Sequence, residues 1–171
     1  YSAATKAAGG VVRHYDLREA MGWLPDLQEL QQQDLRKVKL MWVNYPHMPT
    51  GKLPSEGLFD RLVAFGKKHG ILICHDNPYS FILNGKPQSL LAAEGAFETA
   101  IELNSLSKAS NMAGWRVGML AGARERIDEI LRFKSNMDSG MFLPVQLAAA
   151  RALELDQSWY DELNKIYAER R

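Results

Sequence analysis

The chain has 171 residues, of which 46% are hydrophobic and 24% are charged, so its composition is that of a single globular domain with a sizeable core. Its 21 basic and 20 acidic residues are interspersed and give a formal net charge of +1, without the basic block that nucleic-acid-binding domains carry. No apolar run approaches the ~20 residues of a membrane span, and the first residues lack the order of a signal peptide, so neither nucleic acid nor membrane is an expected partner and a cytoplasmic location is expected.

Strand and helix patterns alternate from the start of the chain. The stretch GGVVRHYDL (9–17) predicts a short strand. LPDLQELQQQD (24–34) predicts a helix that Pro25 and Asp26 begin. KLMWVN (39–44) is a nearly continuous apolar run of strand length, so the chain opens with a strand, a helix and a strand.

Residues 54–69 carry a helical repeat. Leu58, Leu62 and Phe65 recur at the spacing of one helix face. Two lysines close to the end suit the negative pole of a helix dipole, and Gly70 is typical of the left-handed residue that ends a helix. We therefore expect a helix that stops at Gly70.

The second half of the chain continues with strands and then with helices. ILICHD (71–76), TAIELN (99–104) and RVGMLAG (116–122) predict three strands, and Cys74, the sole cysteine, is expected to be an inert core residue in a reducing compartment. Three helices are expected after them, at about 123–137, 144–155 and 157–170. Apolar strands separated by helices predict an α/β fold with three layers, α/β/α, in which helices cover both faces of a mostly parallel sheet.

Polar clusters follow three of the predicted strands. YPHMPTG (45–51) follows the strand at 39–44, DNPY (76–79) ends the next strand, and SLSKASNMAGWRVG (105–118) follows the strand at 99–104. Ligands of open α/β sheets bind outside the carboxyl ends of the strands. The three clusters are therefore expected to lie at one edge of the sheet and to form the candidate site.

Each cluster taken alone also fits a purely structural role. A lysine is usually a solvated surface residue, and a Ser-rich turn after a strand needs no chemistry. Asp76 fits a turn carboxylate, Tyr79 a half-buried aromatic, and the proline-rich cluster an exit loop.

Together the side chains match what pyridoxal phosphate requires. This cofactor needs a lysine amine for its aldehyde, a carboxylate for its ring nitrogen, a hydroxyl near its ring oxygen, and hydroxyl and guanidinium donors for its phosphate. These groups are available, in that order, from Lys108, from Asp76, from Tyr79, and from Ser105, Ser107 and Arg116.

The motifs resemble those of the fold-type I aminotransferases of classes I and II. Members of that family carry, in this order, a Pro-Thr-Gly loop, an Asp-x-x-Tyr, a Ser-x-Ser-Lys and a Gly-x-Arg-x-Gly. The corresponding stretches here are MPTG (48–51), DNPY (76–79), SLSK (105–108) and GWRVG (114–118). The match is specific because residue types, order and spacing all agree.

The resemblance implies a cofactor, a reaction and an assembly. The cofactor is pyridoxal 5′-phosphate, no metal is implied, and the reaction transfers an amino group between an amino acid and a 2-keto acid in a homodimer. Lys108 is implied as the catalytic lysine. The implied cofactor-binding residues are Asp76, Tyr79, Ser105, Ser107 and Arg116.

One departure from the family pattern falls in a functional place. Family members commonly have two asparagines before Pro-Thr-Gly, and the second donates a hydrogen bond to the ring oxygen of the cofactor. Here these positions are His47 and Met48, and methionine has no hydrogen to donate. Tyr79 is then left to bind the ring oxygen alone, or with His47 if its ring turns inward; the alternative is that His47 is a solvated loop residue.

The resemblance also implies that residues 1–171 are part of a longer protein. Family members add an upstream glycine-rich turn for the phosphate, an aromatic residue that stacks on the ring, and a small domain with an arginine for the substrate carboxylate. We expect this chain to be an incomplete large, cofactor-binding domain that is inactive alone. The same scaffold also serves C–S lyases, cyclopropane-forming synthases and the effector-binding halves of transcription regulators, and the sequence does not identify a substrate.

Overall fold

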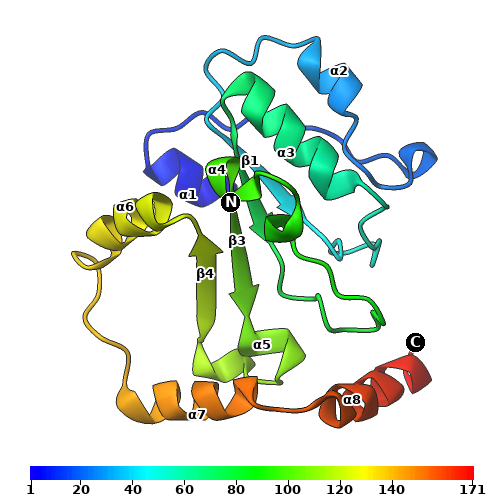
Figure 1. The fold of residues 1–171 in the computed structure, drawn as a ribbon, viewed down its shortest axis with the longest axis vertical. Coiled ribbons are helices and arrows are strands. Elements are labelled where there is room, and N and C mark those ends of the chain that lie inside the picture. The colour runs from blue at the N-terminus through cyan, green and yellow to red at the C-terminus, as the bar shows by residue number, and fades with distance from the viewer.

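The centre of the fold is a four-stranded sheet. The computed structural model describes all of residues 1–171, and its strands lie in the order β1-β2-β3-β4 (Figure 1). β1 (Leu40–Asn44), β2 (Leu72–Asp76) and β3 (Ala100–Ser105) run parallel, whereas β4 (Gly118–Gly122) pairs antiparallel with β3. The sheet is mostly parallel, which confirms the prediction from the alternating strand and helix patterns.

Helices connect and flank these strands. They are α1 (Ser2–Ala7), α2 (Leu27–Gln31), α3 (Leu58–His69), α4 (Ala96–Thr99), α5 (Leu106–Ala109), α6 (Arg124–Lys134), α7 (Leu143–Leu153) and α8 (Gln157–Glu169). Single 3₁₀ turns occupy Glu19–Met21, Leu90–Ala92 and Ala113–Trp115. In Figure 1, α7 passes the end of the sheet at which α5 lies, and α8 continues to the C-terminus beyond it. None of these helices combines the length and the hydropathy needed to span a bilayer.

Three of the predicted elements differ from the structure. The helix predicted at 24–34 is shorter, at Leu27–Gln31, and Asp26 caps it by accepting from the Glu29 N–H at 2.9 Å. The strand predicted at 9–17 is wrong, because this segment is irregular chain that joins no sheet. Val11 is 89% exposed, and Tyr15 is held to β1 through its side chain, whose hydroxyl donates to the Trp42 carbonyl at 2.6 Å. The helix expected from residue 54 begins later, at Leu58, because Gly57 before it has a left-handed backbone (φ 66°) that a helix cannot continue.

Most of the core lies between the sheet and α3. Met41 and Val43 of β1 and Ile73 of β2 face this helix, and its own contribution comes from leucine, valine and phenylalanine side chains. Gly66 allows the close approach, since a Cβ there would lie 2.7 Å from the Ile71 carbonyl oxygen. Gly70 then ends α3 in the left-handed conformation, as the sequence predicted.

A second, smaller apolar cluster lies under the loop that follows β3. Leu106, Met112 and Val117 from that loop are buried against Ala149 of α7. This cluster anchors α5 and the turn before β4 to the body of the protein.

Candidate active site

The register of the strands brings the predicted site residues to one edge of the sheet. Asn44 of β1 pairs with Asp76 of β2, Asp76 pairs with Leu103 of β3, and Ser105 of β3 pairs with Gly118 of β4. Because side chains alternate along a strand, Asn44, Asp76 and Ser105 project from the face of the sheet opposite α3. The candidate site is therefore built on this face, where the carboxyl ends of three strands meet the start of the fourth.

Asp76 is held by groups from two other segments. The hydroxyl of Tyr1 donates a hydrogen bond to its Oδ2 atom, and the Asn44 side chain donates to its backbone carbonyl at 2.7 Å. The Tyr1 ring stacks on Trp42 of β1, with ring centroids 4.4 Å apart and planes 6° from parallel. Burial, together with the hydrogen bond and the charge of Asp76, raises the pKa of Tyr1 well above its ordinary value, so this hydroxyl stays a donor.

The loop after β1 reaches toward Tyr79. Its Met48 lies beside Tyr79, whose hydroxyl is 3.5 Å from the Met48 Sδ atom, and the Met48 backbone N–H donates to Asn44 Oδ1 at 2.8 Å. His47 instead pairs within its own loop, since its Nδ1 atom is 2.8 Å from Thr50 Oγ1, and burial lowers its pKa. The Tyr79 hydroxyl therefore donates to a thioether, which is a weak acceptor and cannot donate in return.

The lysine lies in a short helical turn that begins at the end of β3. Ser105 caps α5, because its Oγ atom accepts a hydrogen bond from the Ser107 backbone N–H at 3.1 Å. Leu106 is buried below the turn, while Lys108 on the same turn is exposed. The sequence thus folds so that one residue anchors the turn and the lysine remains free to react.

Arg116 approaches the same edge from the other side of the turn. It has a left-handed backbone (φ 56°) just before β4, and its guanidinium donates to the Ala113 carbonyl at 2.9 Å. Gly118, two residues on, pairs with Ser105, and a Cβ there would lie 3.0 Å from the Asn104 carbonyl oxygen. The close pairing of β3 and β4 keeps Arg116 near the serine-lysine turn.

All six predicted residues lie at strand ends or in the short segments that follow them at this edge, in two groups. One group follows β3 and consists of Ser105, Ser107, Lys108 and Arg116; the other, at the end of β2, consists of Asp76 and Tyr79. No direct hydrogen bond joins the two groups. The donor set nevertheless fits pyridoxal phosphate, because two hydroxyls and a guanidinium suit an anion and a carboxylate on the neighbouring strand suits a protonated ring.

Three residues at this edge of the sheet were not predicted from the sequence. Asn44, which closes the predicted strand at 39–44, could have been identified from its place at the carboxyl end. Tyr1 and Trp42 could not have been identified, since the Tyr1–Asp76 hydrogen bond joins residues 75 positions apart and no local sequence pattern predicts it.

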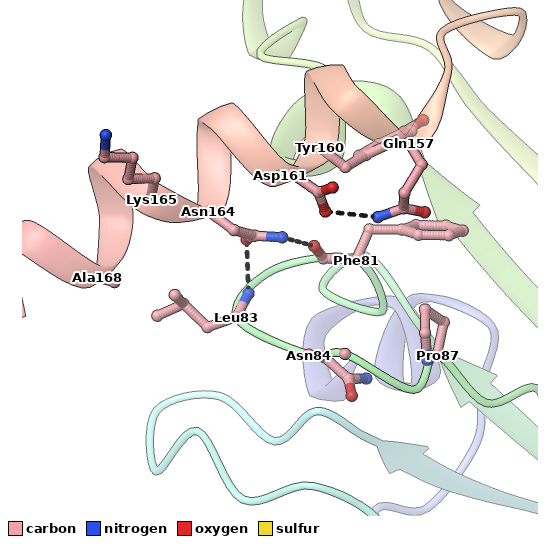
Figure 2. Close-up of a pocket in the computed structure, with 11 residues that line it drawn as sticks. Phe81, Leu83, Asn84, Pro87, Gln157, Tyr160, Asp161, Asn164, Lys165 and Ala168 are labelled. Carbon is pink, nitrogen blue, oxygen red and sulfur yellow. Dashed lines mark hydrogen bonds between the residues drawn. The ribbon is translucent and has the colours of Figure 1, made fainter.

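A separate hollow of about 510 Å³ lies between α8 and the loop after Tyr79 (Figure 2). Asn164 of α8 closes it by accepting from the Leu83 N–H at 2.7 Å and donating to the Phe81 carbonyl at 2.9 Å, while the Phe81 ring stacks on Tyr160. None of the six predicted site residues lines it. These contacts around the hollow hold α8 to the loop after Tyr79.

The chain is similar to aminotransferases both in sequence and in structure. The model of the family described as aminotransferase class I and II matches residues 1–171. An LL-diaminopimelate aminotransferase of Natranaerobius thermophilus is 42% identical over all of this chain and 45% of its own length. Among solved structures, BacF of Bacillus subtilis superposes with a TM-score of 0.95 at 36% identity, over 99% of this chain and 44% of its own. A probable N-succinyldiaminopimelate aminotransferase of Thermus thermophilus superposes with a TM-score of 0.92 at 33% identity, over 99% of this chain and 46% of its own. The chain therefore spans less than half the length of the relatives that it matches.

Proposed function

Because the chain belongs to the aminotransferase class I and II family, which uses pyridoxal phosphate, we propose that it forms the cofactor-binding edge of an enzyme that transfers amino groups. The observation that carries this proposal is the strand register. It aligns the end of β2, with Asp76, and the end of β3, with Ser105, on one face of the sheet beside the turn that holds Lys108.

Each site residue has a role that follows from its chemistry. The bound cofactor supplies an acceptor for the electrons released at the substrate α-carbon. The Lys108 amine would hold the cofactor through its aldehyde and would carry the proton that leaves the substrate α-carbon. The Asp76 carboxylate keeps a proton on the ring nitrogen.

The remaining residues bind and orient. Arg116 would hold the phosphate through its guanidinium, which can offer paired N–H donors to an anion, and Ser105 and Ser107 would add hydroxyl donors. The Tyr79 hydroxyl donates to the ring oxygen, a bond that it has to make without the usual asparagine because Met48 occupies that place.

The proposal extends to the whole protein. We place residues 1–171 in the large domain of a cytoplasmic homodimer, with further pocket residues supplied by segments outside this chain. The buried Cys74, whose pKa is raised to about 12 by desolvation, supports an inert thiol. The names of the curated relatives make amino acids of the diaminopimelate type the first substrates to test.

The other reactions that this scaffold supports are less favoured, because the relatives described above carry aminotransferase names. An assay of the full-length protein separates them. Incubation with pyridoxal phosphate, a 2-keto acid and a panel of amino acids including LL-diaminopimelate is expected to release a new keto acid. Release of a thiol or of ammonia instead would assign a lyase, and ligand binding without turnover would assign an effector-binding domain.

A second experiment uses residues 1–171 expressed alone. They should bind pyridoxal phosphate only weakly, because tight binding requires phosphate donors and a ring-stacking partner to be in place beforehand. A saturable, Lys108-dependent absorbance band with micromolar affinity in this chain would contradict the proposal that other segments complete the pocket.

A further inference from the structure

A buried ion pair lies on the opposite face of the sheet, directly behind the candidate site. His75 of β2 is 0% exposed and Glu102 of β3 is 4% exposed, and the His75 Nδ1 atom is 2.9 Å from Glu102 Oε2. The other ring nitrogen, Nε2, is 2.9 Å from the Tyr45 backbone carbonyl. A carbonyl and a carboxylate only accept hydrogen bonds, so each ring nitrogen of His75 faces an acceptor.

Glu102 is the centre of a larger network. Besides His75, four donors reach its two carboxylate oxygens at 2.8–3.2 Å: the side chains of Asn77, Ser89 and Asn104 and the backbone N–H of Leu90. Burial by itself would raise the pKa of Glu102, but the hydrogen bond and charge of His75, with the amides of Asn104 and Asn77, outweigh it and lower the pKa to about 2.

Stability alone is a weak reason for such a pair. Replacing a buried ion pair with apolar side chains of similar volume is often neutral or stabilising, because the attraction has to offset the loss of hydration of both charges. The positions of the partners point to a different role. His75 and Asn77 flank Asp76 in the chain, and Asn104 immediately precedes Ser105.

One carboxylate therefore fixes the backbone on both sides of Asp76 and next to Ser105. His75 extends the network to the end of β1, where Tyr45 leads into the loop that carries Met48. From this arrangement we infer that Glu102 and His75 are positioning residues, which set the spacing between Asp76 and the serine-lysine turn without touching the cofactor. This inference rests on the function proposed above.

The test replaces Glu102 with glutamine in the full-length protein. Glu102→Gln keeps the shape of the side chain but places a neutral amide in front of the His75 ring nitrogen. The hydrogen bonds that hold the backbone at 76–79 and 105–108 should therefore weaken. Amide hydrogen exchange of the cofactor-free protein is expected to accelerate in both segments. The dissociation constant for pyridoxal phosphate is expected to rise roughly tenfold, the size of effect that follows when a supporting hydrogen-bond partner is removed from a binding site.

Val63→Ala is the matched control. Val63 of α3 is 2% exposed in the same core but takes no part in the network. This variant should lower the melting temperature while leaving the cofactor dissociation constant and the exchange at the two segments as in the wild type. Equal effects of Val63→Ala and Glu102→Gln on binding and exchange would show a general loss of stability and would overturn the inference.

Asn104→Ala is a milder second variant for the case in which Glu102→Gln does not fold. It removes one donor to Glu102 and should accelerate exchange at 105–108 more than at 76–79; unchanged exchange would overturn the inference.

If the wild-type protein binds no pyridoxal phosphate, the proposed function fails, and the exchange data still decide whether the pair positions these segments. If Glu102→Gln binds pyridoxal phosphate normally and exchanges its amide hydrogens at the wild-type rate, the proposed function is unaffected but the positioning role is refuted.

Discussion

Two regions differ at the edge of the sheet where the candidate site lies. On the α3 face, Glu102 and His75 are buried, and their charged groups are fully engaged in hydrogen bonds. The segment that follows β3 differs: its Lys108 and Arg116 are exposed and take part in none of the ion pairs in the structure. The difference separates two tasks: buried groups that are already paired fix the backbone, and exposed groups that are not paired remain available to a ligand.

The largest effect is expected from Lys108, the exposed lysine that we propose binds the cofactor aldehyde. Lys108→Ala in the full-length protein should lower transamination by about a thousandfold or more, because Lys108 is the only amine among the proposed site residues that could bind the aldehyde and carry the proton. Lys86→Ala, at another exposed loop lysine, is the control and should keep wild-type activity. Substantial turnover by the Lys108 variant would refute its catalytic role.

Asp76→Asn should have the next largest effect. A neutral amide cannot stabilise a protonated ring nitrogen, so the rate should fall on the order of a hundredfold while cofactor binding persists. Steady-state kinetics and a cofactor titration of the same preparation separate the two quantities. A small loss of thermal stability with a normal rate would instead identify Asp76 as a plain turn carboxylate.

Arg116→Lys tests the proposed phosphate clamp. Lysine keeps the charge but loses the pair of parallel donors, so the dissociation constant for pyridoxal phosphate should rise roughly tenfold. Arg124→Lys is a matched control, since Arg124 is an exposed arginine of α6 whose partner is Asp128. Equal affinities for all three proteins would remove Arg116 from the site.

The smallest effect is expected from Met48→Asn. The new amide would lie where the Met48 thioether now meets the Tyr79 hydroxyl, and it could donate a second hydrogen bond to the ring oxygen. Cofactor affinity should increase a few-fold, and the pH at which the absorbance of the bound cofactor changes should move. An unchanged affinity and an unchanged pH profile would show that Met48 does not face the cofactor.

The sequence predicted the parts of this structure that depend on local pattern. The four strands from residue 40 to residue 122 are apolar runs, and α3 ends at Gly70 because a left-handed residue is needed there. The segment at 9–17 has the composition of a strand, but strand formation also requires a partner, and Tyr15 contacts β1 through its side chain instead.

The candidate site likewise divides into features that a local sequence pattern predicts and features that depend on distant partners. The six candidate residues could be assigned to one edge, because loops after parallel strands converge there. The Tyr1–Asp76 bond and the pairing of His75 with Glu102 could not be predicted, since the partners are 75 and 27 positions apart and each resembles an ordinary loop or strand residue. The register of β2 and β3 sets the pairing of His75 with Glu102, whereas the Tyr1 bond depends on where the segment before α1 lies, and no local pattern encodes either.

The most direct test of the central claim locates the cofactor on the chain. The full-length protein is loaded with pyridoxal phosphate, reduced with borohydride, digested and analysed by peptide mass spectrometry. The added cofactor mass is expected on Lys108, and Lys108→Ala is expected to carry none. Attachment to a different lysine, or no stable attachment in the wild type, would contradict the assignment of this sheet edge as the cofactor site.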